Sequence, residues 1–250
     1  THFTDVLDLY AFDKKLRTLA FEALEYIEVA VRVDIAHQLG ERDAFAHYSI
    51  NEFHNGLANK VNPRSKKKRF DEWQDKYGSL VNRSKEDFVK HYRAKYGNDL
   101  PIWVAIETWD FGAMSQLYAM MKVADKINIA SKYGLDWKVF ESWLRSLNYL
   151  RNLVAHHSRV WNRNIIDQPK LPKREQISWC DSFIGDEQAL SRPFLLFAIT
   201  GHLLKALCTT EDWHLELQEH LEGFPVQLSD KKLDISDIGV VSGWKEWWLT

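Results

Sequence analysis

The sequence has few of the residues that build turn-rich, disulfide-bonded or membrane-spanning proteins. It contains 11 glycines, 6 prolines and 2 cysteines in 250 residues. So few glycines and prolines disfavour a β-sandwich, and Cys180 and Cys208 show no metal-binding or redox spacing. No apolar run approaches the roughly 20 residues that cross a bilayer, and no secretory signal opens the sequence. We therefore expect a cytoplasmic protein with reduced thiols and no membrane anchor.

Aromatic and aliphatic residues are plentiful, and their spacing is helical. Hydrophobic residues make up 45% of the chain, including 11 Trp, 13 Phe and 9 Tyr, which can fill a large core. Apolar residues recur three or four positions apart, the period of a helix with one buried face, whereas period-two alternation is not sustained. The sequence predicts a single all-α, bundle-like domain over residues 1–250. We expect helices over residues 9–30 with a stop at Gly40, after Ser84, after Pro101, from residue 136 to at least residue 157, and over residues 193–208 and 213–221. We also expect the tryptophan-rich tail to pack back on the core.

Charge is unevenly distributed although the formal net charge is only −2. Residues 51–69 are polar and contain Pro63, so we expect a long connection that is partly flexible. A solvated loop and a phosphate-contacting arm are both consistent with the basic content of this stretch. Six basic residues and no acid lie between positions 60 and 69: Lys60, Arg64, Lys66, Lys67, Lys68 and Arg69.

Residues 151–163, RNLVAHHSRVWNR, form the most basic part of the expected long helix. Arg151 lies roughly 100° to one side of a polar row on that helix, and His157 lies nearer its apolar face. No Asp or Glu occurs from position 144 to position 166, so the row has no local counter-charge. An anion-binding face and an ordinary solvent-facing stripe are the two interpretations, and the missing acids favour the first. The row itself consists of Asn152, His156, Arg159 and Arg163.

These residue types suit one reaction, the metal-independent cleavage of RNA by its own 2′-hydroxyl. A histidine, whose ordinary pKa is near 6.5, can move the protons, and a guanidinium can stabilise the negative charge that builds up on phosphorus. Metal catalysis is less favoured, because adjacent histidines on a helix point about 100° apart and no carboxylate stands nearby. We therefore expect neither a metal nor a cofactor.

The spacing of arginine and histidine is not specific by itself. The chain has three such pairs: Arg32/His37, Arg42/His47 and Arg151/His156. A helical ion pair between Glu28 and Arg32 accounts for the first pair. We keep this pair only as a less favoured candidate for the second half of a cleavage site. The second lies in a loop-like region. Only the third pair has both a polar residue directly after the arginine and further cationic side chains nearby.

Three long stretches resemble the Abi-like proteins of bacterial abortive infection, of the AbiD/AbiF type. They are DVLDLYAFDKKLRTLAFEALEYIEVAVR, SKEDFVKHYRAKYGNDLPIWVAIETWDFGAMSQLY and KYGLDWKVFESWLRSLNYLRNLVAHHSRVWNR. The resemblance implies a helical domain of the HEPN superfamily, many of whose members are metal-independent endoribonucleases. It also implies a further N-terminal stretch that this sequence lacks.

The resemblance further implies a motif of arginine, a polar residue and a histidine four to six positions after the arginine. Arg151, Asn152 and His156 match this motif, and His157 falls in its window. Such nucleases usually form homodimers in which two motifs face one another, and this branch is thought to act with a small non-coding RNA. The stretch from Lys60 to Arg69 is then a natural RNA contact.

Three hypotheses remain open from the sequence. The first is an antiphage endoribonuclease that acts as a homodimer, with Arg151, Asn152, His156 and His157 as catalytic residues. The second is a non-catalytic RNA-binding protein in which Arg159, Arg163 and the basic stretch hold a structured RNA. The third is a toxin-like protein controlled by a protein partner, for which an exposed tryptophan-rich tail would be the contact.

Overall fold

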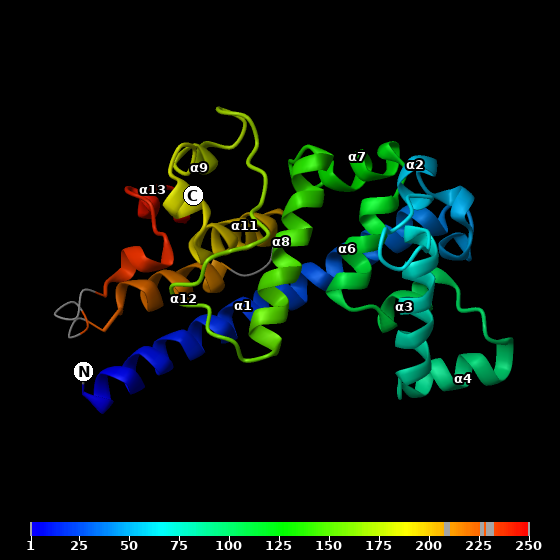
Figure 1. The fold of residues 1–250 in the computed structure, drawn as a ribbon, viewed down its shortest axis with the longest axis horizontal. Coiled ribbons are helices and arrows are strands. Elements are labelled where there is room, and N and C mark those ends of the chain that lie inside the picture. Colours follow the sequence, from blue (N-terminus) through cyan, green and yellow to red (C-terminus); the bar gives the residue numbers. More distant parts are fainter. Residues whose placement is uncertain (1, 208–210, 226–227, 229–232, 250) are drawn as a thin grey trace. The chain divides into compact units, whose positions relative to one another are not determined.

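Helices make up most of the part of the chain that the structure describes (Figure 1). A computed structural model describes residues 2–207, 211–225, 228 and 233–249. Its two compact units are the terminal unit, residues 1–27 and 138–250, and the middle unit, residues 28–137. Outside the helices, β-pairing among the described residues is limited to isolated bridges, so the all-α prediction is confirmed. Two compact units can belong to one domain, and the single-domain prediction stays a prediction.

The opening helix α1, Phe3–Gly40, matches the expected start and stop. Leu16, Leu19, Ala23 and Ile27 are at most 1% exposed, so the predicted apolar stripe is the buried face. Residues up to 27 belong to the terminal unit and the rest of α1 belongs to the middle unit.

The middle unit is built on an aromatic core. Trp73 and Tyr77 stack with ring centroids 5.4 Å apart, and Trp109 meets Trp73 edge-on at 5.5 Å. The indole of Trp73 donates a hydrogen bond of 2.8 Å to the carbonyl of Ala113. The elements of this unit are η1 (Ala46–Tyr48), η2 (Ile50–Glu52), α2 (Asn55–Ala58), α3 (Arg69–Arg83), α4 (Asp87–Tyr96), α5 (Ile102–Ala105), η3 (Ile106–Thr108), α6 (Phe111–Met120) and α7 (Val123–Ser131).

Two helix boundaries in the middle unit bear on the sequence predictions. The expected break at residues 97–101 is confirmed, because α4 ends before Gly97 and α5 begins after Pro101. The expected helix after Ser84 is confirmed as α4, which begins at Asp87 with Glu86 rather than Ser84 at its N-cap. Helix α3 itself was not predicted, although its buried residues recur at helical spacing.

Residues 51–69 have more regular structure than the long connection that the sequence predicts. They contain the end of η2 and all of α2, and an isolated bridge pairs Val61 with Lys68. The carboxylate of Glu72 accepts hydrogen bonds from the side chains of Asn62 and Ser65 and so holds the turn between them. The flexibility of this stretch stays a prediction.

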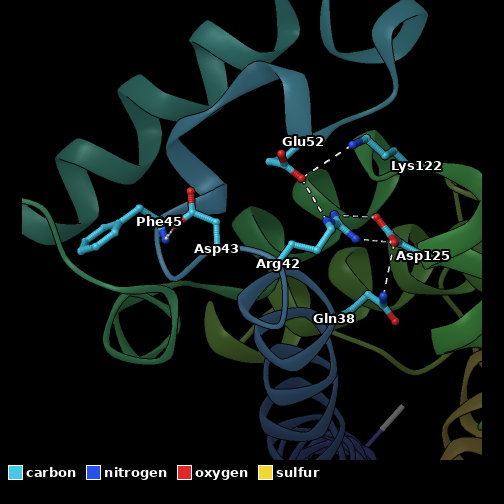
Figure 2. A network of polar contacts seen from close by, with 7 residues as sticks. All are labelled: Gln38, Arg42, Asp43, Phe45, Glu52, Lys122 and Asp125. Atoms are coloured by element: carbon cyan, nitrogen blue, oxygen red, sulfur yellow. Dashed lines mark hydrogen bonds and ion pairs between the residues drawn. The ribbon is translucent and has the colours of Figure 1, made fainter.

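A polar network centred on Arg42 links three elements of the middle unit (Figure 2). The guanidinium of Arg42 donates from Nη1 and Nη2 to the two carboxylate oxygens of Asp125, at 2.8 and 3.0 Å, and from Nε to Glu52 at 2.9 Å. Gln38 also donates to Asp125, at 3.3 Å, and Lys122 lies 3.6 Å from Glu52. Since Asp125 is only 4% exposed, this arginine compensates a buried carboxylate. Arg42 is therefore a structural residue.

The terminal unit joins the first part of α1 to the second half of the chain. The predicted helices 193–208 and 213–221 are confirmed as α11 and α12, with Cys208 outside the described residues. The tail packs on this unit as expected: Trp248 is buried and its indole donates a hydrogen bond of 2.8 Å to the carbonyl of His214. The idea of an exposed tryptophan-rich tail is wrong for Trp244 and Trp248, which are both buried. The remaining elements are α8 (Trp137–Ala155), α9 (Ser178–Asp181), α10 (Glu187–Leu190), α11 (Pro193–Ala206), α12 (Glu211–Glu222), η5 (Ile235–Ile238) and α13 (Trp244–Trp248).

Candidate functional site

The basic stretch lies at the end of α8, where the helix stops at Ala155. The expected helix through His157 is wrong, because His157 adopts a left-handed backbone conformation with φ of 54°. The N–H of His157 bonds to the carbonyl of Val154 at 3.1 Å, and the N–H of Ser158 bonds to the carbonyl of Leu153 at 2.9 Å. This pair of hydrogen bonds is a Schellman motif, which turns the chain out of the helix.

The early stop divides the predicted polar row. Asn152 and His156 stay one helical turn apart, with the N–H of His156 bonded to the carbonyl of Asn152 at 3.1 Å, and both are exposed. Arg159 and Arg163 lie beyond the helix, so their predicted place in the row is wrong. Arg159 is exposed, and Arg163 donates from Nε to the hydroxyl of Tyr149 at 3.1 Å.

The segment after α8 is fastened to α1 by a buried carboxylate. Oδ1 of Asp13 accepts hydrogen bonds from the backbone N–H groups of Val160 and Trp161, at 2.9 and 2.6 Å, and Oδ2 pairs with Arg17. Trp161 is buried, with its ring 5.4 Å from that of Phe12. This clamp sets where the chain leaves the end of α8.

An open groove of about 860 Å³ lies between the end of α8 and the first part of α1. Arg151 and His157 both line it, together with Val154 and Ala155. His157 is exposed, so the prediction that it lies nearer the apolar face is wrong. Asn152 and His156 are exposed but do not line the groove. The polar and aromatic side chains that α1 contributes are those of Tyr10, Lys14, Arg17, Thr18, Phe21, Glu22 and Glu25.

The groove has the counter-charges that the local sequence lacks. Glu22 and Glu25 of α1 line it with Arg151, although no acid occurs between positions 144 and 166. The missing acids of residues 144–166 therefore favour an anion-binding face less than the sequence alone indicates, because two acids of α1 lie at the same groove. Lys14 and Arg17 add positive charge on the α1 side, and Arg17 pairs with Asp13. An anion in this groove would be attracted mainly to Arg151 and Lys14.

The basic turn between Lys60 and Arg69 belongs to the middle unit. All six of its basic side chains except the half-buried Arg69 are exposed. Lys67 lies 2.6 Å from Asp75, and this hydrogen bond raises the pKa of Lys67 above its ordinary value. The other five are Lys60, Arg64, Lys66, Lys68 and Arg69.

The other two arginine–histidine pairs have structural explanations. Arg32 pairs with Glu28, as predicted, and also donates to the carbonyl of Trp109. His37 is exposed and lies 3.6 Å from Glu41. His47 is fully buried, and Arg42 holds Asp125. Neither pair lines the groove at the end of α8.

Neither a membrane-spanning helix nor a metal site is present among the residues that the structure describes. No helix there is long and apolar enough to span a membrane. Nor do any three side chains of His, Cys, Asp and Glu gather there in an arrangement that could hold a metal ion.

The fold and the groove define an all-α protein with an arginine and two histidines at the end of a long helix. A family model described as Abi-like protein matches residues 1–162, which include Arg151, Asn152, His156 and His157. The chain therefore belongs to the Abi-like family, a family associated with abortive infection, a defence against phage. Comparisons with curated proteins and with solved structures give no match.

Proposed function

We propose that this protein is an endoribonuclease of antiphage defence, a member of the HEPN superfamily, that cuts RNA without a metal. The observation that carries the proposal is the composition of the end of α8. Arg151 and His157 line one groove, while Asn152 and His156 are exposed one turn apart at the same helix end. A guanidinium and an imidazole within one solvent-accessible site are the groups that this reaction requires.

The proposed reaction needs no external reagent. The 2′-oxygen of a ribose forms a bond to the adjacent phosphorus, and the bond from phosphorus to the 5′-oxygen breaks. One imidazole, of His156 or His157, accepts the proton of the 2′-hydroxyl, and a protonated imidazole gives a proton to the leaving 5′-oxygen. The guanidinium of Arg151 stabilises the charge on the phosphorane oxygens. The products are a 2′,3′-cyclic phosphate and a 5′-hydroxyl.

A homodimer supplies the acid and the base together. In the proposed arrangement, the groove of one copy faces that of a second copy, so that two arginines and two pairs of histidines surround one phosphate. The groove is open rather than enclosed, which leaves its Arg151 side accessible to a second copy and to RNA.

The test is RNA cleavage by the purified full chain in the presence of EDTA. We expect single-stranded RNA to be cut with cyclic phosphate ends. His156→Ala should slow cleavage by about 10²- to 10⁴-fold and Arg151→Ala by about 10²- to 10³-fold. Arg145→Ala is the matched control, because Arg145 is an exposed arginine of the same helix, 3.9 Å from Asp167. Equal rates for wild type, Arg151→Ala and His156→Ala would refute the catalytic proposal.

A second candidate function is non-catalytic RNA binding, and the exposed basic turn favours it. Its cations project from a short turn closed by the Val61–Lys68 bridge, a shape that can follow a phosphate backbone. Replacing Lys66, Lys67 and Lys68 with glutamate should then abolish RNA co-purification, while His156→Ala leaves phage protection intact. Sequencing the RNA that co-purifies would identify the partner and separate it from substrate.

A further inference from the structure

A second pocket lies in the part of the terminal unit that the family model does not cover. The match ends at residue 162, whereas this pocket is formed by residues of α9, α11, α12 and α13. Its volume is about 250 Å³, roughly that of eight water molecules at about 30 Å³ each. We call it the tryptophan pocket. The side chains that carry the argument are Ser178, Trp179, His202, Lys205, Trp247 and Trp248.

The walls of the tryptophan pocket are flat aromatic rings. The rings of Trp179 and Trp247 stack with centroids 5.6 Å apart and planes 27° from parallel. Both are half-buried, so each keeps accessible surface, whereas Trp248 is buried behind them. Paired indoles of this kind present a π-surface that suits a planar ring.

A cation without a carboxylate partner lies at the same pocket. Nζ of Lys205 donates a hydrogen bond of 3.0 Å to the carbonyl of Trp248. Within the described residues, Lys205 forms no ion pair with an Asp or Glu side chain. Partial burial lowers the pKa of this lysine, so an anion that bound there would favour its charged form. The pocket therefore combines an aromatic wall with a positive charge.

Two further polar side chains, those of His202 and Ser178, line the pocket. The indole N–H of Trp179 donates to Nδ1 of His202 at 3.4 Å, so a neutral His202 carries its proton on Nε2. Ser178 is exposed and presents a hydroxyl that can donate to an oxyanion. A ring with an attached anionic group matches these features better than a quaternary ammonium ion, which Lys205 would repel.

We propose that the tryptophan pocket binds a nucleoside monophosphate. The base lies against Trp179 and Trp247, and the phosphate is held by Lys205 and Ser178. The pocket volume admits one base. A free nucleotide and the terminal nucleotide of an RNA share this chemistry. None of these residues lines the groove at Arg151, so the site is independent of the proposed cleavage reaction.

The test is calorimetric titration of the full chain with AMP, CMP, GMP and UMP. We expect at least one to bind at micromolar to millimolar concentration, and adenosine and ribose 5-phosphate to bind at least about tenfold more weakly. Lys205→Gln should weaken nucleotide binding about tenfold or more and leave adenosine binding unchanged. Lys245→Gln is the matched control, because Lys245 is exposed at the same end of the chain but pairs with Glu222.

Further titrations separate the two sources of the nucleotide. A pentanucleotide with a 5′- or 3′-phosphate that binds more tightly than the matching monophosphate would identify an RNA end, and the reverse order would identify a free nucleotide. The His156→Ala variant should bind the monophosphates like wild type, so a failure of the nuclease proposal leaves this one intact. No binding of any monophosphate, equal binding by Lys205→Gln, or tighter binding of choline would overturn it.

Discussion

Acid should destabilise the middle unit through one buried histidine, His47. The ring of His47 is fully buried, with centroids 4.2 Å from Tyr48 and 5.4 Å from Tyr77. Neither ring nitrogen has a hydrogen-bond partner among the described residues. Burial lowers the pKa of His47 from 6.5 to about 4, and the charge of Asp43 offsets only part of this effect. The fold therefore holds this imidazole in its neutral form.

The sign and size of the effect follow from the two pKa values. Because the folded pKa lies below the unfolded one, the contribution of His47 to stability is complete above about pH 7 and is lost as the pH falls from 6.5 towards 4. One pKa unit corresponds to about 1.36 kcal/mol, so the loss reaches about 3.4 kcal/mol at the acid limit. At about pH 5 it amounts to about 2 kcal/mol.

Urea unfolding followed by circular dichroism at about pH 7.5 and about pH 5 measures this loss. Between these two pH values, the free energy of unfolding of the variant His47→Leu should fall by about 2 kcal/mol less than that of wild type. This difference does not depend on the stability of the variant at neutral pH. The exposed His91 provides the matched control, since His91→Leu should keep the pH dependence of wild type. Equal losses for His47→Leu and wild type would refute the reasoning.

Three further substitutions test the packing around the candidate site and the middle unit. His157→Gly should raise the free energy of unfolding by about 1 kcal/mol, because glycine adopts positive φ without strain; a lower value in urea unfolding would contradict the left-handed cap. Asp13→Ala should lower it by about 3–5 kcal/mol, because Arg17 and two backbone N–H groups lose their acceptor, and a thermal midpoint like that of wild type would exclude the clamp. Asp125→Ala should lower it by about 2–3 kcal/mol, because the fork of Arg42 loses both oxygens, whereas a change below about 0.5 kcal/mol would show that the network is dispensable.

The sequence predicted the opening helix α1 and its buried face well, because both depend on local spacing. The stripe through Leu16, Leu19 and Ala23 needed only the helical period, and the stop at Gly40 followed from the preference for glycine at helix ends. The Glu28–Arg32 pair likewise followed from a separation of four residues. Such features can be read from one segment, so distant parts of the chain do not alter them.

The candidate site was only partly predictable, because much of it depends on segments far apart in the chain. The Schellman motif ends α8 at a histidine, although glycine is the usual residue at positive φ, so no local signal marked the stop. The carboxylates of Glu22 and Glu25 come from α1, more than a hundred positions before Arg151. The role of Asp13 was not predictable either, because its hydrogen-bond donors, the backbone N–H groups of Val160 and Trp161, lie almost 150 positions away in the chain.

The two adjacent histidines now have different structural positions, which makes their roles separable. A left-handed conformation costs a residue other than glycine about 1–2 kcal/mol, yet position 157 carries an imidazole that lines the groove with Arg151. Strain at a groove wall is the kind of cost that a functional side chain can explain. His156, in contrast, is unstrained, exposed and one turn from Asn152. Since His157→Gly removes the imidazole while it preserves the cap, a loss of RNA cleavage in that variant would assign the chemistry to His157. Cleavage that persists there and disappears in His156→Ala would assign it to His156.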